Sequence, residues 1–167
     1  MSLQSCADLV ARGDPDRFRA AMAAPVTARR VLFPLYAFNI EVTRAPWVTE
    51  EPMIAEMRLQ FWRDVIAELA EGAPPRAHEV AAPLAAAVPA DKVGALDALV
   101  AARRLDVYKD PFPDQAAFEG YIADTAGPLV TVPARVLGAP EAAEPVLADA
   151  AWAHGLAAYL RAIPALE

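Results

Sequence analysis

Three aspartates in this sequence have a spacing that could bind a metal ion. Asp106, Asp110 and Asp114 follow one another at intervals of four residues. Side chains four residues apart share one face of a helix, and carboxylate oxygens are ligands that Mg²⁺ prefers. Pro111 and Pro113 fall within the same segment, and proline interrupts a helix. We therefore expect a helix end followed by a loop here, in preference to a metal site.

Cysteine and histidine add little further chemistry. Cys6 is the single cysteine, which excludes an intrachain disulfide and any metal site with two cysteines. The two histidines, His78 and His154, lie far apart in the sequence and share no metal-ligand spacing. No Ser-His-Asp or Cys-His pattern and no glycine-rich phosphate loop is present in the sequence. The usual motifs of nucleophilic catalysis and phosphate binding are therefore missing.

The composition is typical of a folded protein with an acidic surface. Hydrophobic residues make up 56% of the 167 residues and the mean hydropathy is +0.24, which excludes a disordered chain. The formal net charge of -7 disfavours nucleic acid as a partner, because phosphate binding needs a basic surface. The longest apolar stretch, residues 31–40, is too short to span a bilayer, and no signal peptide is evident. We expect one cytoplasmic domain over residues 1–167.

Proline, glycine and capping residues divide the sequence into helical segments, and no strand pattern with a period of two is present. Asp14, Thr27, Asp91 and Asp114 are the expected N-caps, because their side chains can accept hydrogen bonds from free amides. Pro34 predicts a kink or a late start in its helix. The expected fold class is all-α. We expect helices over residues 3–11, 15–24, 28–44, 52–71, 91–108 and 140–163, a short helix within the connector 76–90, and a helix from residue 115 that bends or breaks at residues 128 and 133.

Four runs of residues form a recognisable series of motifs. The first is Asp-Pro-Asp-Arg-Phe at residues 14–18, and the second is Leu-Tyr-Ala-Phe-Asn at residues 35–39. The third is Met-Arg-Leu-Gln-Phe-Trp-Arg-Asp at residues 57–64, and the fourth is Tyr-Ile-Ala-Asp-Thr-Ala-Gly at residues 121–127. In this order and spacing they resemble the squalene/phytoene synthase family, and the likeness covers nearly the whole chain.

The resemblance implies an isoprenoid synthase-like bundle of helices around a central cavity. In that family two aspartate-rich motifs face each other across the cavity and hold Mg²⁺, which binds the diphosphates of two prenyl substrates. The metal stabilises the negative charge that develops on the departing diphosphate. The resemblance also implies further helices beyond the second motif, so we expect this chain, which ends at Glu167, to be truncated at its C-terminus.

The sequence departs from the family at the metal-binding positions. The paired aspartates of the first motif correspond to Thr43 and Arg44, and a third falls near Trp47, which leaves Glu41 as the carboxylate of that helix. An arginine in place of a ligand repels a metal ion. The second motif corresponds to residues 158–162, where alanine occupies both polar positions. We therefore expect no metal cofactor.

Several other residues are candidates for facing the cavity or a diphosphate group. The tyrosines among them could equally pack in the core with a hydrogen-bonded hydroxyl, and an Arg103–Asp106 pair could be purely structural. The candidates are Tyr36, Glu41, Arg58, Arg63, Asp64, Arg103, Asp106, Tyr121 and Arg161.

The resemblance points to a non-catalytic member of the family. One branch combines these motifs with degenerate aspartates, and its mitochondrial member is an assembly factor for respiratory complex I. The implied role is an assembly or scaffold factor that contacts a respiratory-complex subunit at the periphery of the inner membrane, alone or as an oligomer. Two alternatives stay open. One is a Mg²⁺-dependent prenyltransferase with Glu41, Asp64, Asp106 and Asp110 as ligands, and the other is a carrier that binds an isoprenoid lipid without chemistry.

Overall fold

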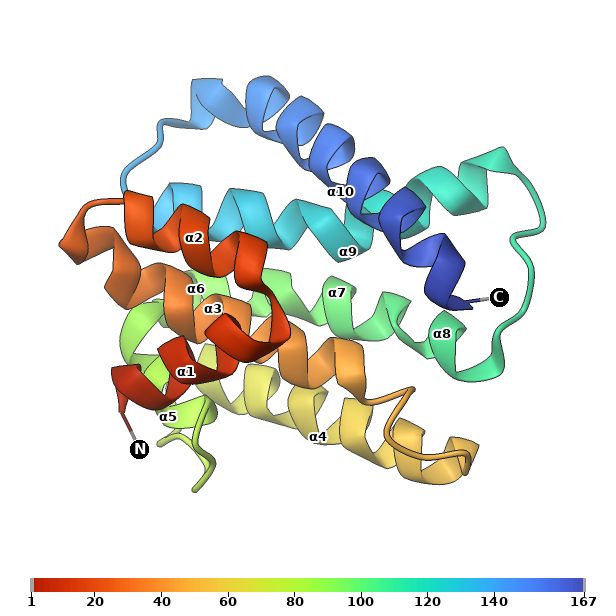
Figure 1. Cartoon of the computed structure of the whole chain (residues 1–167). Helices are drawn as coiled ribbons and strands as arrows, with labels where there is room; N and C mark the ends of the chain where they lie inside the picture. The colour runs from red at the N-terminus through yellow and green to blue at the C-terminus, as the bar shows by residue number, and fades with distance from the viewer. Residues whose placement is uncertain (1, 167) are drawn as a thin grey trace.

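The chain folds as a bundle of helices, as the sequence predicts (Figure 1). The structure is a computed structural model that describes residues 2–166, with side chains described for residues 2–162. Within residues 2–166 every regular element is a helix. The α-helices are α1 (Leu3–Gly13), α2 (Pro15–Ala23), α3 (Val26–Arg44), α4 (Pro52–Ala70), α5 (Ala81–Ala87), α6 (Ala90–Val93), α7 (Asp97–Ala102), α8 (Arg104–Tyr108), α9 (Gln115–Val136) and α10 (Glu144–Leu166), and the 3-10 helices are η1 (Gly94–Leu96) and η2 (Glu141–Ala143).

Two of the expected N-caps are confirmed and two are wrong. The Asp14 carboxylate accepts a hydrogen bond from the Arg17 amide at 3.0 Å, and Asp114 caps α9 in the same way. Thr27 and Asp91 instead lie inside α3 and α6, which begin directly after Pro25 and Pro89. Proline has a backbone φ close to the helical value, so a proline preceding the first turn can start a helix without a side-chain cap. The sequence therefore located these helices correctly and assigned two of their first residues wrongly.

Prolines inside two helices do not break them. Helix α3 continues through Pro34, and α9 continues through Pro128 and Pro133, so the expected late start and break do not occur. All three prolines are buried, and the packing around them offsets the backbone hydrogen bond that each one removes. The side chain of Thr131 also donates to the Gly127 carbonyl at 3.0 Å, across the turn of α9 that contains Pro128.

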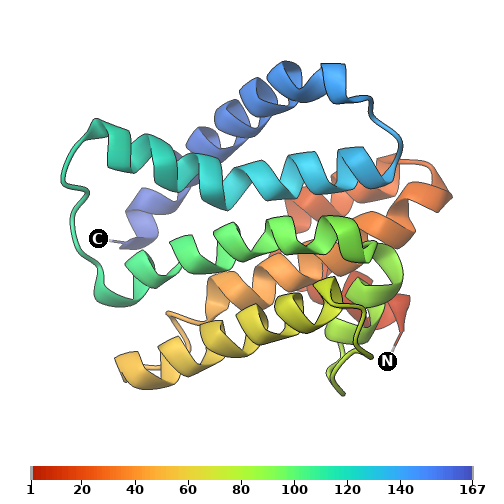
Figure 2. The same ribbon diagram turned by 180° about the vertical axis from the view of Figure 1, so that it is seen from behind.

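The single helix expected over residues 91–108 is divided into four short pieces. Helix α6 is followed by η1, α7 and α8, with a turn at Arg103 between the last two. Figure 2 shows α7 and α8 following one another along one direction, so the path of the chain is close to that expected. Gly94 starts the 3-10 segment, and glycine has the lowest helix propensity after proline. The break at Arg103 is important because this residue faces the cavity described below.

Helix α3 lies at the centre of the core and contacts helices on several sides. It packs against α1, α2, α4, α5 and α9. Leu35 and Phe38 of α3 are completely buried, and the Phe38 ring meets the Trp62 ring of α4 edge-on at 5.2 Å between centroids. In both ribbon views α9 and α10 lie on one side of the molecule and α4 lies on the opposite side (Figures 1 and 2). No helix of the described chain is long and apolar enough to cross a membrane.

The thiol of Cys6 is expected to be unreactive in the folded protein. Cys6 is 1% exposed, and its burial, with a smaller effect from Glu79, raises the pKa of the thiol to about 11. The thiolate is the reacting form, so both its accessibility and its abundance are low at neutral pH. Ellman's reagent at pH 8 should label Cys6 slowly in the native protein and rapidly after unfolding in guanidinium chloride. Fast labelling of the native protein would contradict the burial of this residue.

Candidate functional site

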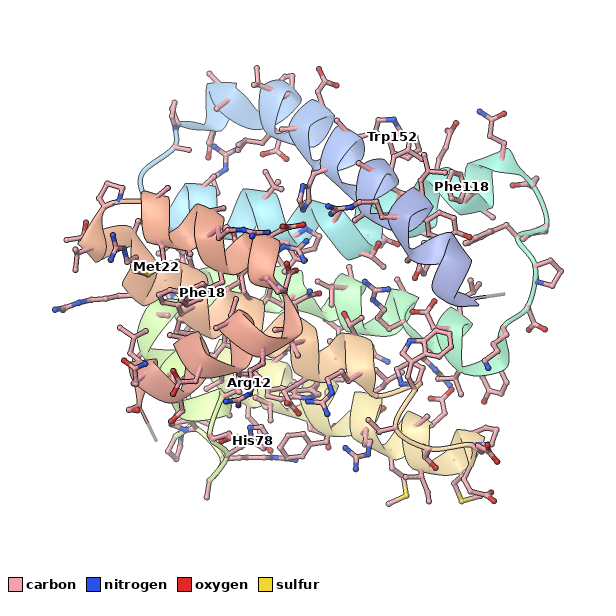
Figure 3. All side chains as sticks on the ribbon, in the orientation of Figure 1. Arg12, Phe18, Met22, His78, Phe118 and Trp152 are labelled. Atoms are coloured by element: carbon pink, nitrogen blue, oxygen red, sulfur yellow. The ribbon has the colours of Figure 1, made fainter. Side chains whose placement is uncertain are left out.

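A cavity of about 530 Å³ lies between the ends of α3 and α8 on one side and α9 and α10 on the other. The start of α2 also contributes to its lining, through Asp14 and Arg17. Its apolar wall consists of Phe112, Ile122, Leu129 and Tyr159 among others. Phe112, Tyr121 and Tyr159 of this wall belong to an aromatic cluster that also includes Phe118 and Trp152 of α9 and α10, which Figure 3 labels.

Three of the candidate residues form one hydrogen-bonded group in the cavity. Arg103 donates to the Asp106 carboxylate at 3.1 Å and to the Tyr121 hydroxyl oxygen at 2.8 Å. The Tyr121 hydroxyl donates to the other oxygen of Asp106 at 2.7 Å. Burial raises the pKa of Tyr121, and the neighbouring Asp106 carboxylate adds to the rise while Arg103 opposes it. The tyrosine therefore stays protonated at neutral pH and holds the carboxylate in place as a fixed donor.

Positive charge gathers at the end of the cavity where α3 and α8 terminate. Arg44 is the last residue of α3, and Lys109 directly follows α8 with a left-handed backbone, at φ 56°. The Lys109 ammonium lies 5.1 Å from the centre of the Trp47 ring, which is a cation–π distance. Arg44, Trp47 and Lys109 all line the cavity.

Helices α2 and α10 meet beside the cavity through polar contacts. Arg17 pairs with Asp14 at 2.7 Å, and another guanidinium nitrogen of Arg17 lies 3.2 Å from His154 Nε2. Arg161 pairs with Asp16 at 3.0 Å. Because arginine can only donate, this arrangement requires a neutral His154 that accepts through Nε2.

The His154 contact makes a pH-dependent prediction. His154 is only partly shielded from water, and this partial desolvation lowers its pKa, which the charges of Arg17 and Arg161 lower further. The unfolded chain therefore binds a proton at a higher pH than the folded chain does. The stability from a neutral His154 is complete above a pH of about 6.5 and is lost as the pH falls through the lowered folded pKa. NMR titration should give a His154 pKa below the ordinary value, which Arg17→Gln raises and Arg58→Gln leaves unchanged. A His154 pKa at or above the ordinary value would contradict the contact.

The remaining candidate residues lie outside the cavity lining. Tyr36 packs against the core under the Arg17 guanidinium, which lies 5.6 Å from the ring centroid, and Glu41 is half-buried on α3. Arg63 binds Asp97 through two hydrogen bonds of 2.8 and 2.9 Å. The others are on the surface: Arg58 is exposed, Asp64 contacts Gln60 and Arg76, and Arg161 pairs with Asp16.

The residues that the resemblance assigns to the family's metal-binding positions line the cavity. Thr43, Arg44 and Trp47 line one side, and Ala158 and Ala162 line the facing side on α10. Their side chains offer one hydroxyl and no carboxylate.

The carboxylates that do line the cavity also fail to fit a magnesium site. Asp14 caps α2 and pairs with Arg17, and Asp106 is held by Arg103 and Tyr121, so Asp110 is the one cavity carboxylate without an ion pair among the described side chains. Among those side chains, no group of three or more His, Cys, Asp or Glu residues could hold a metal ion. The prenyltransferase ligand set proposed above is not assembled, because Glu41 and Asp64 lie outside the cavity.

Sequence reasoning missed several residues of the cavity. Asn39 is 6% exposed and lines the cavity, whereas the motif at residues 35–39 assigns it no role. A polar residue within an apolar helical run was the available signal for it. Lys109 is one of two lysines in a chain rich in arginine, but no local pattern relates it to Trp47.

Comparisons with known proteins agree with the motifs. The squalene/phytoene synthase family model matches residues 10–167. A Drosophila melanogaster protein described as an NADH dehydrogenase (ubiquinone) complex I, assembly factor 6 homolog is 42% identical over 62 residues, which are 36% of this chain and 19% of that protein. The NADH dehydrogenase (ubiquinone) complex I, assembly factor 6 proteins of Mus musculus and Homo sapiens are each 25% identical over 162 residues, covering 95% of this chain and 48% of theirs.

The chain thus spans about half the length of these mammalian relatives. No solved structure matches it. The family match extends from the second half of α1 to the last residue and includes every element that forms the cavity. This chain therefore belongs to the squalene/phytoene synthase family.

Proposed function

We propose that this protein is a non-catalytic member of its family that serves as an assembly or scaffold factor for a respiratory complex of the complex I type. The proposal rests on the residues that line the cavity where the family binds its metal ions. The resemblance assigns Thr43, Arg44, Trp47, Ala158 and Ala162 to those metal-binding positions, and these residues line the cavity and supply no carboxylate.

The physical reason concerns charge on the leaving group. Joining two prenyl groups requires diphosphate to leave an allylic carbon, and clustered divalent cations stabilise the negative charge that develops. Here a divalent cation would find one unpaired carboxylate, Asp110, and would meet the positive charges of Arg44 and Lys109. The residues present therefore disfavour the metal-dependent reaction.

The assembly role draws its support from the relatives. The mouse and human proteins named complex I, assembly factor 6 align with 95% of this chain. As part of the proposal, the partner is a complex I subunit or subcomplex, and the site of action is the periphery of the inner membrane.

The absence of catalysis can be tested directly. Purified protein incubated with farnesyl or geranylgeranyl diphosphate and Mg²⁺ should form no condensation product, while an active squalene or phytoene synthase assayed in parallel forms it. Turnover at ordinary enzyme rates, on the order of 1 s⁻¹ or more, would overturn the non-catalytic assignment.

The assembly role needs a genetic experiment. Deletion of the gene in its own organism should lower the amount of assembled complex I, seen on native gels and as NADH:ubiquinone oxidoreductase activity. Reintroducing the wild-type gene should restore both, and other respiratory complexes serve as the control. Unchanged complex I in the deletion strain would overturn the assembly role.

A further inference from the structure

The cavity has an excess of unpaired positive charge. Two of its carboxylates, Asp14 and Asp106, are neutralised by the neighbouring arginines described above. Arg44 and Lys109 form no ion pair with any described side chain, and one unpaired carboxylate, Asp110, remains against them. Since an unpaired cation beside an apolar cavity attracts an anion, the charges favour a ligand with a negative group.

The two residues with unpaired cations come from distant parts of the chain, and each has a contact with Trp47, through the backbone for Arg44 and through the side chain for Lys109. The Trp47 amide donates to the Arg44 carbonyl at 2.9 Å, in the turn that follows α3. Lys109 approaches the Trp47 ring from the end of α8. A second hollow of about 660 Å³, next to the α3–α4 loop, shares Trp47 and Lys109 with the cavity. These side chains therefore stand at the edge where the cavity meets the outer surface.

An amide donor that lines the cavity has no acceptor among the described side chains. Asn39 lies on α3 and is 6% exposed. Its amide oxygen accepts from Thr43 at 3.4 Å, but its amide nitrogen makes no hydrogen bond to any residue with a described side chain. Arg103 Nε is the buried side-chain atom that lacks a partner among the described residues, so the Asn39 nitrogen is accessible from the cavity and can donate to a ligand oxygen there.

The rest of the lining is suited to an apolar chain. Phe112, Ile122, Leu129 and Tyr159 present aromatic and aliphatic surface, and Ala158 leaves space on α10. The volume of about 530 Å³ lies within the range of roughly 300–1,000 Å³ that is usual for small-molecule sites. The cavity thus combines an apolar interior with a cationic edge.

We propose that the cavity binds an amphiphile whose head is a carboxylate or a phosphate monoester on an apolar chain, and that it does so without a divalent cation. The head group lies against Arg44 and Lys109, the chain lies along the apolar wall, and Asn39 supplies a further donor on α3. The inference rests on the proposed function in one respect: the cavity holds its ligand and does not convert it.

Ligand binding can be measured on the purified full chain. Oleate below its critical micelle concentration, farnesyl monophosphate and inorganic phosphate are compared by calorimetry and thermal unfolding, each in EDTA and in Mg²⁺. We expect at least one of the two amphiphiles, oleate and farnesyl monophosphate, to bind as tightly in EDTA as in Mg²⁺. Which of them binds shows whether the head group is a carboxylate or a phosphate monoester. No binding of either amphiphile, binding that requires Mg²⁺, or equal binding of inorganic phosphate would overturn the proposal.

Matched arginine and lysine variants locate the site. Arg44→Gln and Lys109→Gln should each weaken amphiphile binding about tenfold, as expected for loss of a charged hydrogen bond. Arg58→Gln removes an exposed arginine on α4 outside the cavity and should leave binding unchanged. All three positions are exposed, so circular dichroism should show folded proteins. Equal weakening by Arg58→Gln would overturn the proposal.

The binding measurements are independent of the gene deletion, because the deletion reports on complex assembly alone.

Discussion

Replacement of Asp106 by alanine should lower the free energy of unfolding by about 3 kcal/mol, the low end for breaking a buried ion pair. The Asp106 and Arg103 side chains are 14% and 18% exposed, so water screens their interaction poorly. The variant leaves the Arg103 guanidinium without its counter-ion, and the Nε atom of that group is already buried without a hydrogen-bond partner in the described structure. Urea unfolding followed by circular dichroism measures the change.

Two variants serve as controls for Asp106→Ala. Tyr121→Phe removes the hydroxyl but keeps the ion pair, and should cost about 1 kcal/mol. Asp16→Ala breaks the exposed pair with Arg161, where both side chains are more than half exposed, and should leave the unfolding midpoint nearly unchanged. If Asp106→Ala moves the midpoint no more than Asp16→Ala does, the three-residue group does not support the fold.

Replacement of Gly155 by valine should destabilise the protein by about 3 kcal/mol and displace α10 from α9. A Cβ atom at Gly155 would lie 2.6 Å from the Ala126 Cβ and 2.9 Å from the Ile122 Cγ2. Both neighbours are buried on α9, so neither can move aside without shifting the helix. Since α10 carries Ala158 and Tyr159 of the cavity wall, amphiphile binding should weaken together with stability.

Gly120→Ala provides the matched control on α9. A Cβ atom at Gly120 meets no other atom within 4 Å, and the residue lies inside a helix. Alanine there should raise the free energy of unfolding by about 0.5–1 kcal/mol, because glycine has more backbone freedom to lose on folding. The midpoints of thermal and urea unfolding should therefore both fall for Gly155→Val and both rise for Gly120→Ala. A shift in the same direction would contradict the close approach of α9 and α10.

Much of the site was predictable where the signal was local. The family resemblance suggested that Arg103 and Asp106 belong together, and they form an ion pair with Tyr121 as a third member. The interruption by Pro111 and Pro113 correctly indicated a loop after α8, since residues 110–114 follow the end of that helix. In contrast, Arg58 and Arg161 belong to matching motifs but lie outside the cavity, because a motif does not specify which face of its helix is covered.

The errors in the fold have a common physical cause. A late start at Pro34 and breaks at Pro128 and Pro133, expected from local hydrogen bonding as alternatives to a kink or a bend, do not occur. The burial of these prolines in the core stabilises helical turns that would be weak in an isolated peptide. The caps expected at Thr27 and Asp91 failed for a related reason, since neighbouring prolines began those helices earlier.

By itself, the sequence determined the all-α class, the approximate helices and the absence of a carboxylate at residues 43, 44, 47, 158 and 162, which the resemblance assigns to the family's metal-binding positions. These properties depend on residue type and on spacing within one helix, where neighbours are defined by the 3.6-residue repeat. Tertiary structure alone decided that Lys109 reaches Trp47, that His154 meets Arg17, and that α9 and α10 approach closely at Gly155. The residues that meet in each of these contacts are at least 29 positions apart in the sequence, and only the packing of the core brings such residues together.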